Sequence, residues 1–259
     1  MQLFKTRNVD SDTGLNWQFE PKWDGFRCLA YRAGKEVDLR AKSGKPLARY
    51  FPEVVAMIGA LPQRQFVVDG ELAIPMGDAL SFDALQMRIH PAESRIKKLA
   101  AETPALLILF DMLMDAEGKS LIEAPLKTRR AALQDFYKSA GEAGQLKLSP
   151  YTLDRGKAES WLEDARGSLD GVVSKRIDSP YLPGGRAMLK VKQLRTADCV
   201  VGGFRYASGS REVGSRFSRF GRRRFFCALI DPLYGARLSR RECAVPTVSW
   251  PKPQFLVSE

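Results

Sequence analysis

The stretch Glu20-Pro21-Lys22-Trp23-Asp24-Gly25-Phe26-Arg27 places an aspartate and a glycine shortly after a lysine. Alternating and apolar residues predict one strand over residues 16–19 and another over residues 26–33. We therefore expect Lys22 in the loop between them, where the two strands present its amine at a defined angle. An amine is nucleophilic only when it is neutral, so such a lysine requires desolvation or nearby cations, including a bound metal. Gly25 lets the backbone pass close to a ligand.

Short strands and amphipathic helices continue on the C-terminal side of this stretch. Periodicity and turn residues predict further strands over residues 36–41, 66–74, 105–113, 171–176 and 188–193, and helices over residues 52–61, 81–89, 93–101, 125–139 and 157–165. Several hairpins without regular strand–helix alternation predict an α+β domain built on antiparallel sheets with flanking helices, which we assign to residues 1–195. A strand-like run over residues 198–206 begins a smaller β domain, assigned to residues 196–259 and irregular after about residue 215.

The composition limits the chemistry and the partners. A net charge of +11 and a pI near 9.6 favour a polyanionic partner, and nucleic acid fits better than a membrane surface. No apolar run is long enough to span a bilayer, and residues 1–10 lack the apolar core of a secretion signal, so we expect a cytoplasmic protein. His90 is the single histidine, and the four cysteines form no CxxC pair. Histidine-based triads and zinc sites are therefore disfavoured, which leaves lysine, carboxylates and metal.

Four further segments follow the lysine in a fixed order. They are Val68-Asp69-Gly70-Glu71-Leu72, Leu109-Phe110-Asp111-Met112-Leu113, Asp170-Gly171-Val172-Val173-Ser174-Lys175 and Leu189-Lys190-Val191-Lys192. This series resembles motifs I, III, IIIa, IV and V of the covalent nucleotidyltransferases. Within that superfamily it most resembles the small bacterial ATP-dependent DNA ligases, including the ligase domain of end-joining enzymes. The resemblance extends over about residues 17–215 and identifies residues 1–195 as an adenylation domain.

The resemblance implies a role for each candidate site residue. Lys22 would be the nucleophile that attacks the α-phosphate of ATP. Asp170 would hold Mg²⁺, with Mn²⁺ as the alternative metal, and Glu71 would bind the metal or the ribose. The expected nucleotide contacts are Glu20 at the base, Phe110 stacked on adenine, Arg27 at the ribose or a DNA phosphate, and Lys42, Lys175, Lys190 and Lys192 at phosphates. Arg40 competes with Lys42, because Ala41 replaces the serine that usually precedes this cation.

Lys190 and Lys192 alternate on one predicted strand, so both are expected on the same face. The resemblance implies three reaction steps. Lys22 takes AMP from ATP, AMP passes to the 5′-phosphate at a nick in duplex DNA, and the 3′-hydroxyl displaces AMP to seal the strand. Such an enzyme would act in DNA repair or recombination, by default as a monomer. The alternatives are an RNA ligase or capping nucleotidyltransferase, which share the lysine chemistry, and a noncatalytic or partly active nucleic-acid-binding fragment.

The C-terminal region departs from the family pattern. An OB-fold is implied after the fifth motif, and residues 196–206 resemble its opening strand. From Arg216 the resemblance stops, and the basic motif that orients the pyrophosphate is not found. We therefore expect an incomplete OB-like domain, as a shifted reading frame or a truncated gene product would give. Slow or absent self-adenylylation would follow, although preformed adenylylated DNA would still be sealed by a folded core.

Overall fold

The computed structural model describes residues 16–141, 144–163, 169–185 and 187–191, together with the backbone of four strands within residues 200–258. The chain divides into two compact units. One comprises residues 1–193 and 255–259, and the other residues 194–254. In the described part of the chain, no helix is long and apolar enough to cross a membrane.

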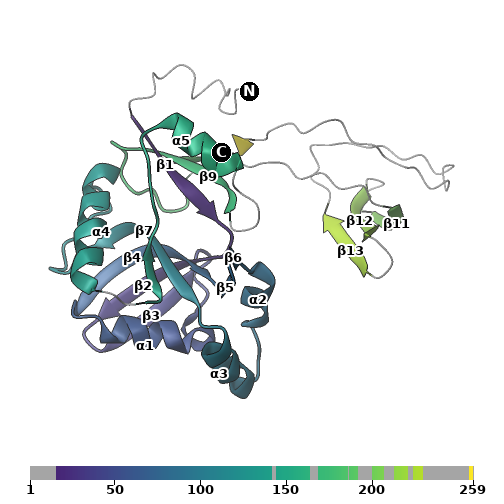
Figure 1. Cartoon of the computed structure of the whole chain (residues 1–259), viewed down its shortest axis with the longest axis horizontal. Coiled ribbons are helices and arrows are strands. Elements are labelled where there is room, and N and C mark those ends of the chain that lie inside the picture. The colour runs from purple at the N-terminus through teal and green to yellow at the C-terminus, as the bar shows by residue number, and fades with distance from the viewer. Residues whose placement is uncertain are drawn as a thin grey trace. The chain divides into compact units, whose positions relative to one another are not determined.

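The first unit contains two main sheets (Figure 1). The central sheet has the strand order β3-β2-β4-β7-β8, and only its β7–β8 pair is parallel. The second sheet has the antiparallel order β1-β9-β10-β14. The bounds are β1 Trp17–Trp23, β2 Phe26–Ala33, β3 Glu36–Ala41, β4 Gln65–Ala73, β7 Leu106–Met114, β8 Leu146–Leu148, β9 Leu169–Arg176, β10 Met188–Val191 and β14 Val257–Ser258. A small hairpin adds β5 Pro75–Met76 and β6 Ala79–Leu80.

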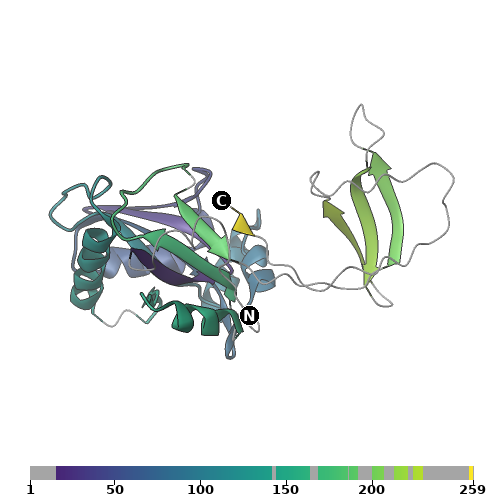
Figure 2. The ribbon, with the colours of Figure 1, turned by 90° about the horizontal axis from the view of Figure 1, so that it is seen from above.

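Helices cover one face of each sheet, as Figure 1 and the view from above in Figure 2 show. They are the 3-10 helix η1 Ala48–Tyr50, α1 Pro52–Ala60, α2 Phe82–Met87, α3 Glu93–Glu102, α4 Leu126–Ala140 and α5 Arg155–Glu163. Pro52 begins α1, where its missing N–H costs nothing, and the Ser81 hydroxyl caps α2 by accepting a bond from the Ala84 N–H. Arg32 donates to the carbonyls of Ile58, Gly59 and Leu61 and so satisfies the end of α1.

Two apolar cores result from this layering. The larger one lies between the central sheet and helices α1, α2 and α4, and it includes Phe51, Leu72, Leu107 and an edge-on pair of Phe66 and Phe136 with ring centroids 4.6 Å apart. Each such side chain contributes roughly 1.5–3 kcal/mol when buried. The smaller core lies under α5 and contains Trp17, Phe19, Leu162, Val172 and Val191. Because each sheet turns only one face to its core, the opposite faces are left for polar side chains.

Most predicted elements occur within a few residues of their expected bounds, but the place of Lys22 differs. The strand predicted over residues 16–19 continues to Trp23, so Lys22 lies within β1 and not in a loop. Pro21 lies in this extension, and proline cannot donate a ladder hydrogen bond. Since β1 is an edge strand and Pro21 still lies opposite Val172, the proline is accommodated and the strand carries Lys22 opposite Gly171.

The described part of the second unit is an antiparallel sheet of β11 Val200–Tyr206, β12 Val213–Phe220 and β13 Arg224–Leu229. Strand β12 corrects the expectation of irregular structure after about residue 215, since Arg216 and Phe217 pair with Ala228 and Cys227. Its Ser-Arg-Phe triplets over residues 215–220 repeat every three residues, so the strand lacks the period-2 pattern that would reveal it. The OB-like domain and the assignment of residues 196–259 to it stay predictions.

Candidate active site

The second sheet turns a charged face toward the central sheet. Side chains of β1 alternate, so Trp17 and Phe19 enter the core under α5 while Gln18, Glu20 and Lys22 point to the other side. Residues directly opposite in an antiparallel pair share a face. Lys175 of β9 therefore joins this face opposite Gln18, and Lys190 of β10 joins it opposite Val173. Lys175 and Lys190 were predicted on strands, but Lys22 was expected in a loop, and the sequence did not show that the three lysines share one sheet face.

The central sheet contributes the opposing face. In β4, Val68 and Leu72 enter the large core, whereas Asp69 and Glu71 point to the other side. Arg27 of β2 lies opposite Glu71 and therefore shares this face. The β4–β7 pairing shifts register between Asp69 and Gly70, and Phe110 of β7 lies in this irregularity. The Lys175 ammonium lies 4.8 Å from the centroid of the Phe110 ring, so the two faces meet there.

Lys22 forms a close ion pair in this space. Its Nζ lies 2.5 Å from Oδ2 of Asp170, and the side chains are 21% and 36% exposed. Gly25 explains how the chain turns from β1 into β2 against β4. A Cβ atom at this position would lie 2.2 Å from the Leu72 carbonyl oxygen and 2.8 Å from Cγ of Glu71, so only glycine fits. The turn therefore fixes the lysine strand against the strand that carries Glu71.

Glu71 is a carboxylate in an unfavourable environment. Burial raises its pKa to about 8, although the positive charges of Lys22 and Arg27 act in the opposite direction. The negative charges of Asp69 and Asp24 raise the pKa further. The nearby positive charges do not fully offset the burial of this carboxylate, and a bound cation would stabilise its charged form.

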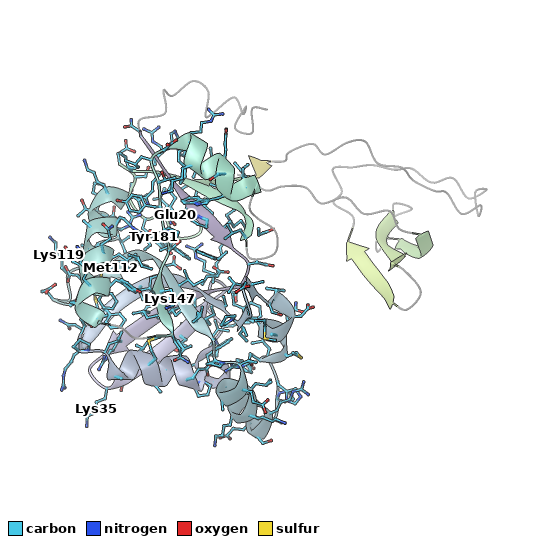
Figure 3. All side chains as sticks on the ribbon, viewed as in Figure 1. Glu20, Lys35, Met112, Lys119, Lys147 and Tyr181 are labelled. Atoms are coloured by element: carbon cyan, nitrogen blue, oxygen red, sulfur yellow. The ribbon has the colours of Figure 1, made fainter. Side chains whose placement is uncertain are left out.

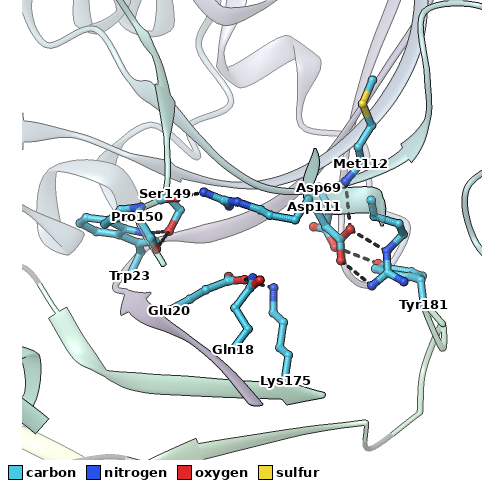
Figure 4. Close-up of polar contacts among 12 residues, drawn as sticks. Gln18, Glu20, Trp23, Asp69, Asp111, Met112, Ser149, Pro150, Lys175 and Tyr181 are labelled. Carbon is cyan, nitrogen blue, oxygen red and sulfur yellow. Dashed lines mark hydrogen bonds and ion pairs between the residues drawn. The ribbon is translucent and has the colours of Figure 1, made fainter. Parts of the chain in front are cut away.

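Glu20 and Lys175 form a buried pair with Gln18 (Figure 4). Glu20 accepts a hydrogen bond from Nε2 of Gln18 at 2.6 Å and one from Nζ of Lys175 at 2.8 Å. All three side chains are buried. The structure places the Lys175 ammonium between Glu20 and the face of Phe110, and Lys175 also lines the cavity described below, so its expected phosphate contact stays a prediction. Glu20, which was expected at the base, and Lys175 therefore belong to one hydrogen-bond network.

Two buried aspartates of the central sheet bind arginines that sequence reasoning did not pair with them. Arg27 forks onto Asp69, with Nη2 2.6 Å from Oδ2 and Nε 3.1 Å from Oδ1. Arg129 of α4 forks onto Asp111 at 2.8 and 3.1 Å. The Tyr181 hydroxyl donates to Asp69 at 2.8 Å (Figure 4). Asp69 and Asp111 lie in quoted motifs, but no sequence pattern indicated Arg129 or Tyr181, because the contact of Arg129 depends on how α4 packs against β7 and that of Tyr181 on the path of the chain after β9.

A cavity of about 340 Å³ lies beside these groups. The cationic residues that line it are Arg27, Lys42, Arg129, Lys175, Arg176 and Lys190. The remaining described lining includes the chain from Ser179 to Gly185 and does not include Lys22, Glu71 or Asp170. The cavity therefore lies next to the group formed by Lys22, Asp170 and Glu71, because Arg27 lines the cavity and lies opposite Glu71. The positive charge of the lining suits a phosphate-bearing ligand.

The competing candidates Lys42 and Arg40 occupy different surroundings. Lys42 is exposed and lines the cavity. Arg40 forms an exposed ion pair with Asp38, with Nε 2.6 Å from Oδ2, and it is not among the described residues of the lining. The geometry therefore favours Lys42 as the cation near a ligand. Lys192, the partner expected for Lys190, lies outside the described residues.

Within the part of the chain that the structure describes, no group of three or more histidine, cysteine, aspartate or glutamate side chains gathers to form a complete metal site. Asp170 and Glu71 are the two carboxylates beside Lys22. Mg²⁺ commonly binds through one or two carboxylates and takes its other ligands from substrate phosphates and water. The donor set therefore fits a metal that arrives with a nucleotide.

Comparisons with known proteins agree with this geometry. Residues 6–192 match the family model described as ATP dependent DNA ligase domain. DNA ligase C of Mycobacterium tuberculosis is 45% identical over 205 residues, which cover 76% of this chain and 56% of that protein. DNA ligase C1 of Mycolicibacterium smegmatis is 42% identical over 212 residues, which cover 80% and 60%. The chain thus spans little more than half the length of these relatives.

Solved structures share the fold. The crystal structure of the ligase domain from M. tuberculosis LigD matches with a TM-score of 0.53 at 26% identity, covering 88% of this chain and 69% of that one. A structure of a Lig E DNA ligase matches with a TM-score of 0.60 at 17% identity, covering 88% and 83%, which supports the fold alone. These matches confirm the predicted α+β class with antiparallel sheets and flanking helices. The chain belongs to the ATP-dependent DNA ligase domain family.

Proposed function

We propose that this chain carries the adenylyl-transfer centre of an ATP-dependent DNA ligase that seals nicks in duplex DNA during repair or recombination. The observation that carries the proposal is the Lys22 amine on the charged face of β1, paired at 2.5 Å with Asp170, with a charge that partly offsets the burial by which the pKa of Glu71 is raised. The relatives named DNA ligase C and the ligase domain of LigD support the choice of reaction. We further propose a cytoplasmic monomer that takes ATP and nicked duplex DNA as substrates.

In the first step, Nζ of Lys22 attacks the α-phosphorus of ATP. A P–N bond forms, the bond from the α-phosphorus to the bridging oxygen of the β-phosphate breaks, and pyrophosphate leaves. The amine must lose a proton to attack. Oδ2 of Asp170 is the acceptor already in contact with that amine, so we assign it the role of holding or accepting this proton.

Asp170 and Glu71 would hold Mg²⁺, with Mn²⁺ as the alternative. The raised pKa of Glu71 supports this assignment, because a nearby cation would favour its charged form. When bound, such a metal neutralises charge on the phosphates and on the leaving pyrophosphate.

The remaining candidates are assigned along the nucleotide. Phe110 supplies the flat apolar surface for adenine, and Glu20 lies beyond it at the base end. Arg27 serves the ribose or a phosphate, while Lys42, Lys190 and Lys192 serve phosphates, as the cationic cavity supports for the described residues among them. Lys175 holds Glu20. AMP then passes to the 5′-phosphate of a nick, and the 3′-hydroxyl displaces it.

The test uses α-labelled ATP with Mg²⁺, followed by denaturation of the protein. We expect label on the wild-type chain and none on Lys22→Ala, because the lysine forms the covalent bond. Lys35→Ala is a matched control, since Lys35 is exposed at the tip of the β2–β3 hairpin, away from Glu20 and Tyr181 (Figure 3). Labelled GTP separates an ATP-dependent ligase from a capping enzyme. Absence of label from the wild type, together with failure to seal preformed adenylylated nicked DNA, would support the noncatalytic alternative.

A further inference from the structure

The segment between β9 and β10 returns to the central sheet through Tyr181. Its hydroxyl donates to Oδ2 of Asp69 at 2.8 Å and lies 3.2 Å from Nη2 of Arg27, which donates to it. Its backbone N–H donates to the carbonyl of Ile122 at 2.8 Å. Tyr181 therefore connects three parts of the chain that are distant in sequence: β2, β4 and the loop before α4.

Asp69 requires these partners because it is fully buried. A buried carboxylate is stable only when its oxygens are paired or hydrogen-bonded. Arg27 supplies a fork, and Tyr181 supplies an additional donor to the same oxygen that receives Nη2. Burial and the negative charge of Asp69 raise the pKa of Tyr181, so its hydroxyl remains a donor at any ordinary pH.

Arg27 and Tyr181 both line the cavity, and Arg27 is the positively charged member of this group that can bind a phosphate-bearing ligand there. The guanidinium carbon of Arg27 lies 5.7 Å from the Phe110 ring centroid. In the described hydrogen bonds, Nε and Nη2 serve Asp69 and Tyr181, while Nη1 donates to no protein group. The tyrosine hydroxyl and the aspartate thus fix the plane of the fork and leave one nitrogen for the cavity.

Separate contacts hold the segment that carries Tyr181. The carbonyl of Ser179 accepts bonds from the Leu126 N–H at 3.0 Å and from Nη1 of Arg129 at 3.1 Å, and the carbonyl of Ile177 accepts one from the Lys127 N–H. These contacts do not involve the tyrosine hydroxyl. Removing that hydroxyl should therefore leave the chain in place and affect mainly Asp69 and Arg27.

We propose that Tyr181 is a positioning residue that orients Arg27 toward the nucleotide through their shared contact with Asp69. The inference rests on the proposed function for the identity of the nucleotide. Arg27 would contact parts of ATP that do not react, so its contribution to binding is the same in the ground state and in the transition state. Displacement of Arg27 therefore weakens nucleotide binding more than it slows the transfer of AMP. Loss of a hydrogen bond to a charged group corresponds to roughly a tenfold or larger change in affinity.

The experiment measures binding of α,β-methylene-ATP with Mg²⁺, a probe whose bridging carbon prevents AMP transfer. We compare the wild type with Tyr181→Phe, Arg27→Lys and the double variant. Arg27→Lys keeps the charge that Asp69 requires but loses the fork. Tyr137→Phe is the matched control, because it also removes one hydroxyl that donates to a protein oxygen, here the carbonyl of Leu146. Thermal melting of each variant reports whether it folds.

We expect Tyr181→Phe to weaken binding roughly tenfold, Tyr137→Phe to leave it unchanged, and Tyr181→Phe to add little in the Arg27→Lys background. Label transfer from saturating ATP should change much less than the affinity. Wild-type-like binding by Tyr181→Phe, an equal loss in both backgrounds, or unfolding of Tyr181→Phe would each overturn the inference. Failure of the proposed function is distinguished by absence of covalent label, because the binding comparison does not require that chemistry. A wild type that does not bind the probe would contradict both.

Discussion

Replacing Glu71 by glutamine should stabilise the metal-free protein at alkaline pH while removing a group that the proposed reaction needs. Burial holds the pKa of this carboxyl near 8, and Lys22 and Arg27 only partly offset the effect. Glutamine has nearly the same shape and no charge. The substitution therefore separates the cost of burying a charge from the packing of the side chain.

The direction of this pH effect on stability depends on whether the folded or the unfolded protein holds the proton on Glu71. In the unfolded chain the carboxyl ionises near its ordinary value of 4.5, whereas in the folded protein it keeps its proton up to about pH 8. The raised pKa thus contributes stability that is fully present below pH 4.5 and is lost as the pH rises through about 8. At about 1.36 kcal/mol per pH unit the loss is on the order of 3–5 kcal/mol. Glutamine does not titrate and should avoid it.

Urea unfolding in EDTA between pH 4.5 and 9 measures this difference. We expect similar stability of wild type and Glu71→Gln at the acid end, and an advantage of roughly 3–5 kcal/mol for the variant at pH 9. Glu117→Gln, on an exposed turn, should follow the wild type throughout. Parallel pH curves for wild type and Glu71→Gln, or a variant less stable at pH 9, would refute the reasoning about burial. Covalent labelling with ATP and Mg²⁺ should fall in the same variant.

Three further outcomes follow from contacts described above. Gly25→Ala should lose about 1–3 kcal/mol in urea unfolding and label at least roughly tenfold more slowly, because its Cβ would overlap a carbonyl of β4. Gly59→Ala, on α1 with open space around it, should instead be neutral or stabilising, and equal effects at the two glycines would contradict the steric argument. Asp170→Asn keeps the shape but not the charge beside the lysine, so single-turnover labelling should slow roughly 100-fold with an unchanged melting temperature; a wild-type rate would remove Asp170 from the mechanism. Arg129→Met should lose about 3–5 kcal/mol, because Asp111 would be left buried without its partner, and near-wild-type stability in urea would show that the pair is dispensable.

The sequence predicted the layered architecture well because its periodicity is strong. The hairpin over residues 26–41 has its predicted bounds, since alternating residues flank a turn at Gly34, whose φ of 62° suits glycine. The strand that contains Lys22 was predicted to end at Phe19, but it continues to Trp23 through Pro21, which has no N–H to donate. An edge strand does not need that donor, and edge position is a tertiary property. Strand β12 was missed for a different reason, since its sequence VGSRFSRF repeats Ser-Arg-Phe every three residues and shows no period-2 alternation.

The site was only partly predictable. Alternation predicted that Lys190 and Lys192 share one face of a strand, whereas Lys22 was expected in a loop, and the motif order supplied Glu71, Phe110 and Asp170 as candidates whose roles stay predictions. The pairing of Glu20 with Lys175 required the register of β1 against β9, which no local pattern encodes. The contacts of Tyr181 with Asp69 required the path of an irregular segment between two strands. Long-range side-chain pairs of this kind depend on the assembled fold, so sequence periodicity cannot specify them.

Pro21 and the segment after β8 also determine what can bind beside strand β1. Phe19 exchanges both backbone hydrogen bonds with Thr152 on the outer side of β1, and two residues later the proline offers no donor at all. A foreign strand therefore finds no continuous row of donors and acceptors with which to extend the sheet. The free edge of β1 next to Lys22 is thus protected against strand addition and aggregation.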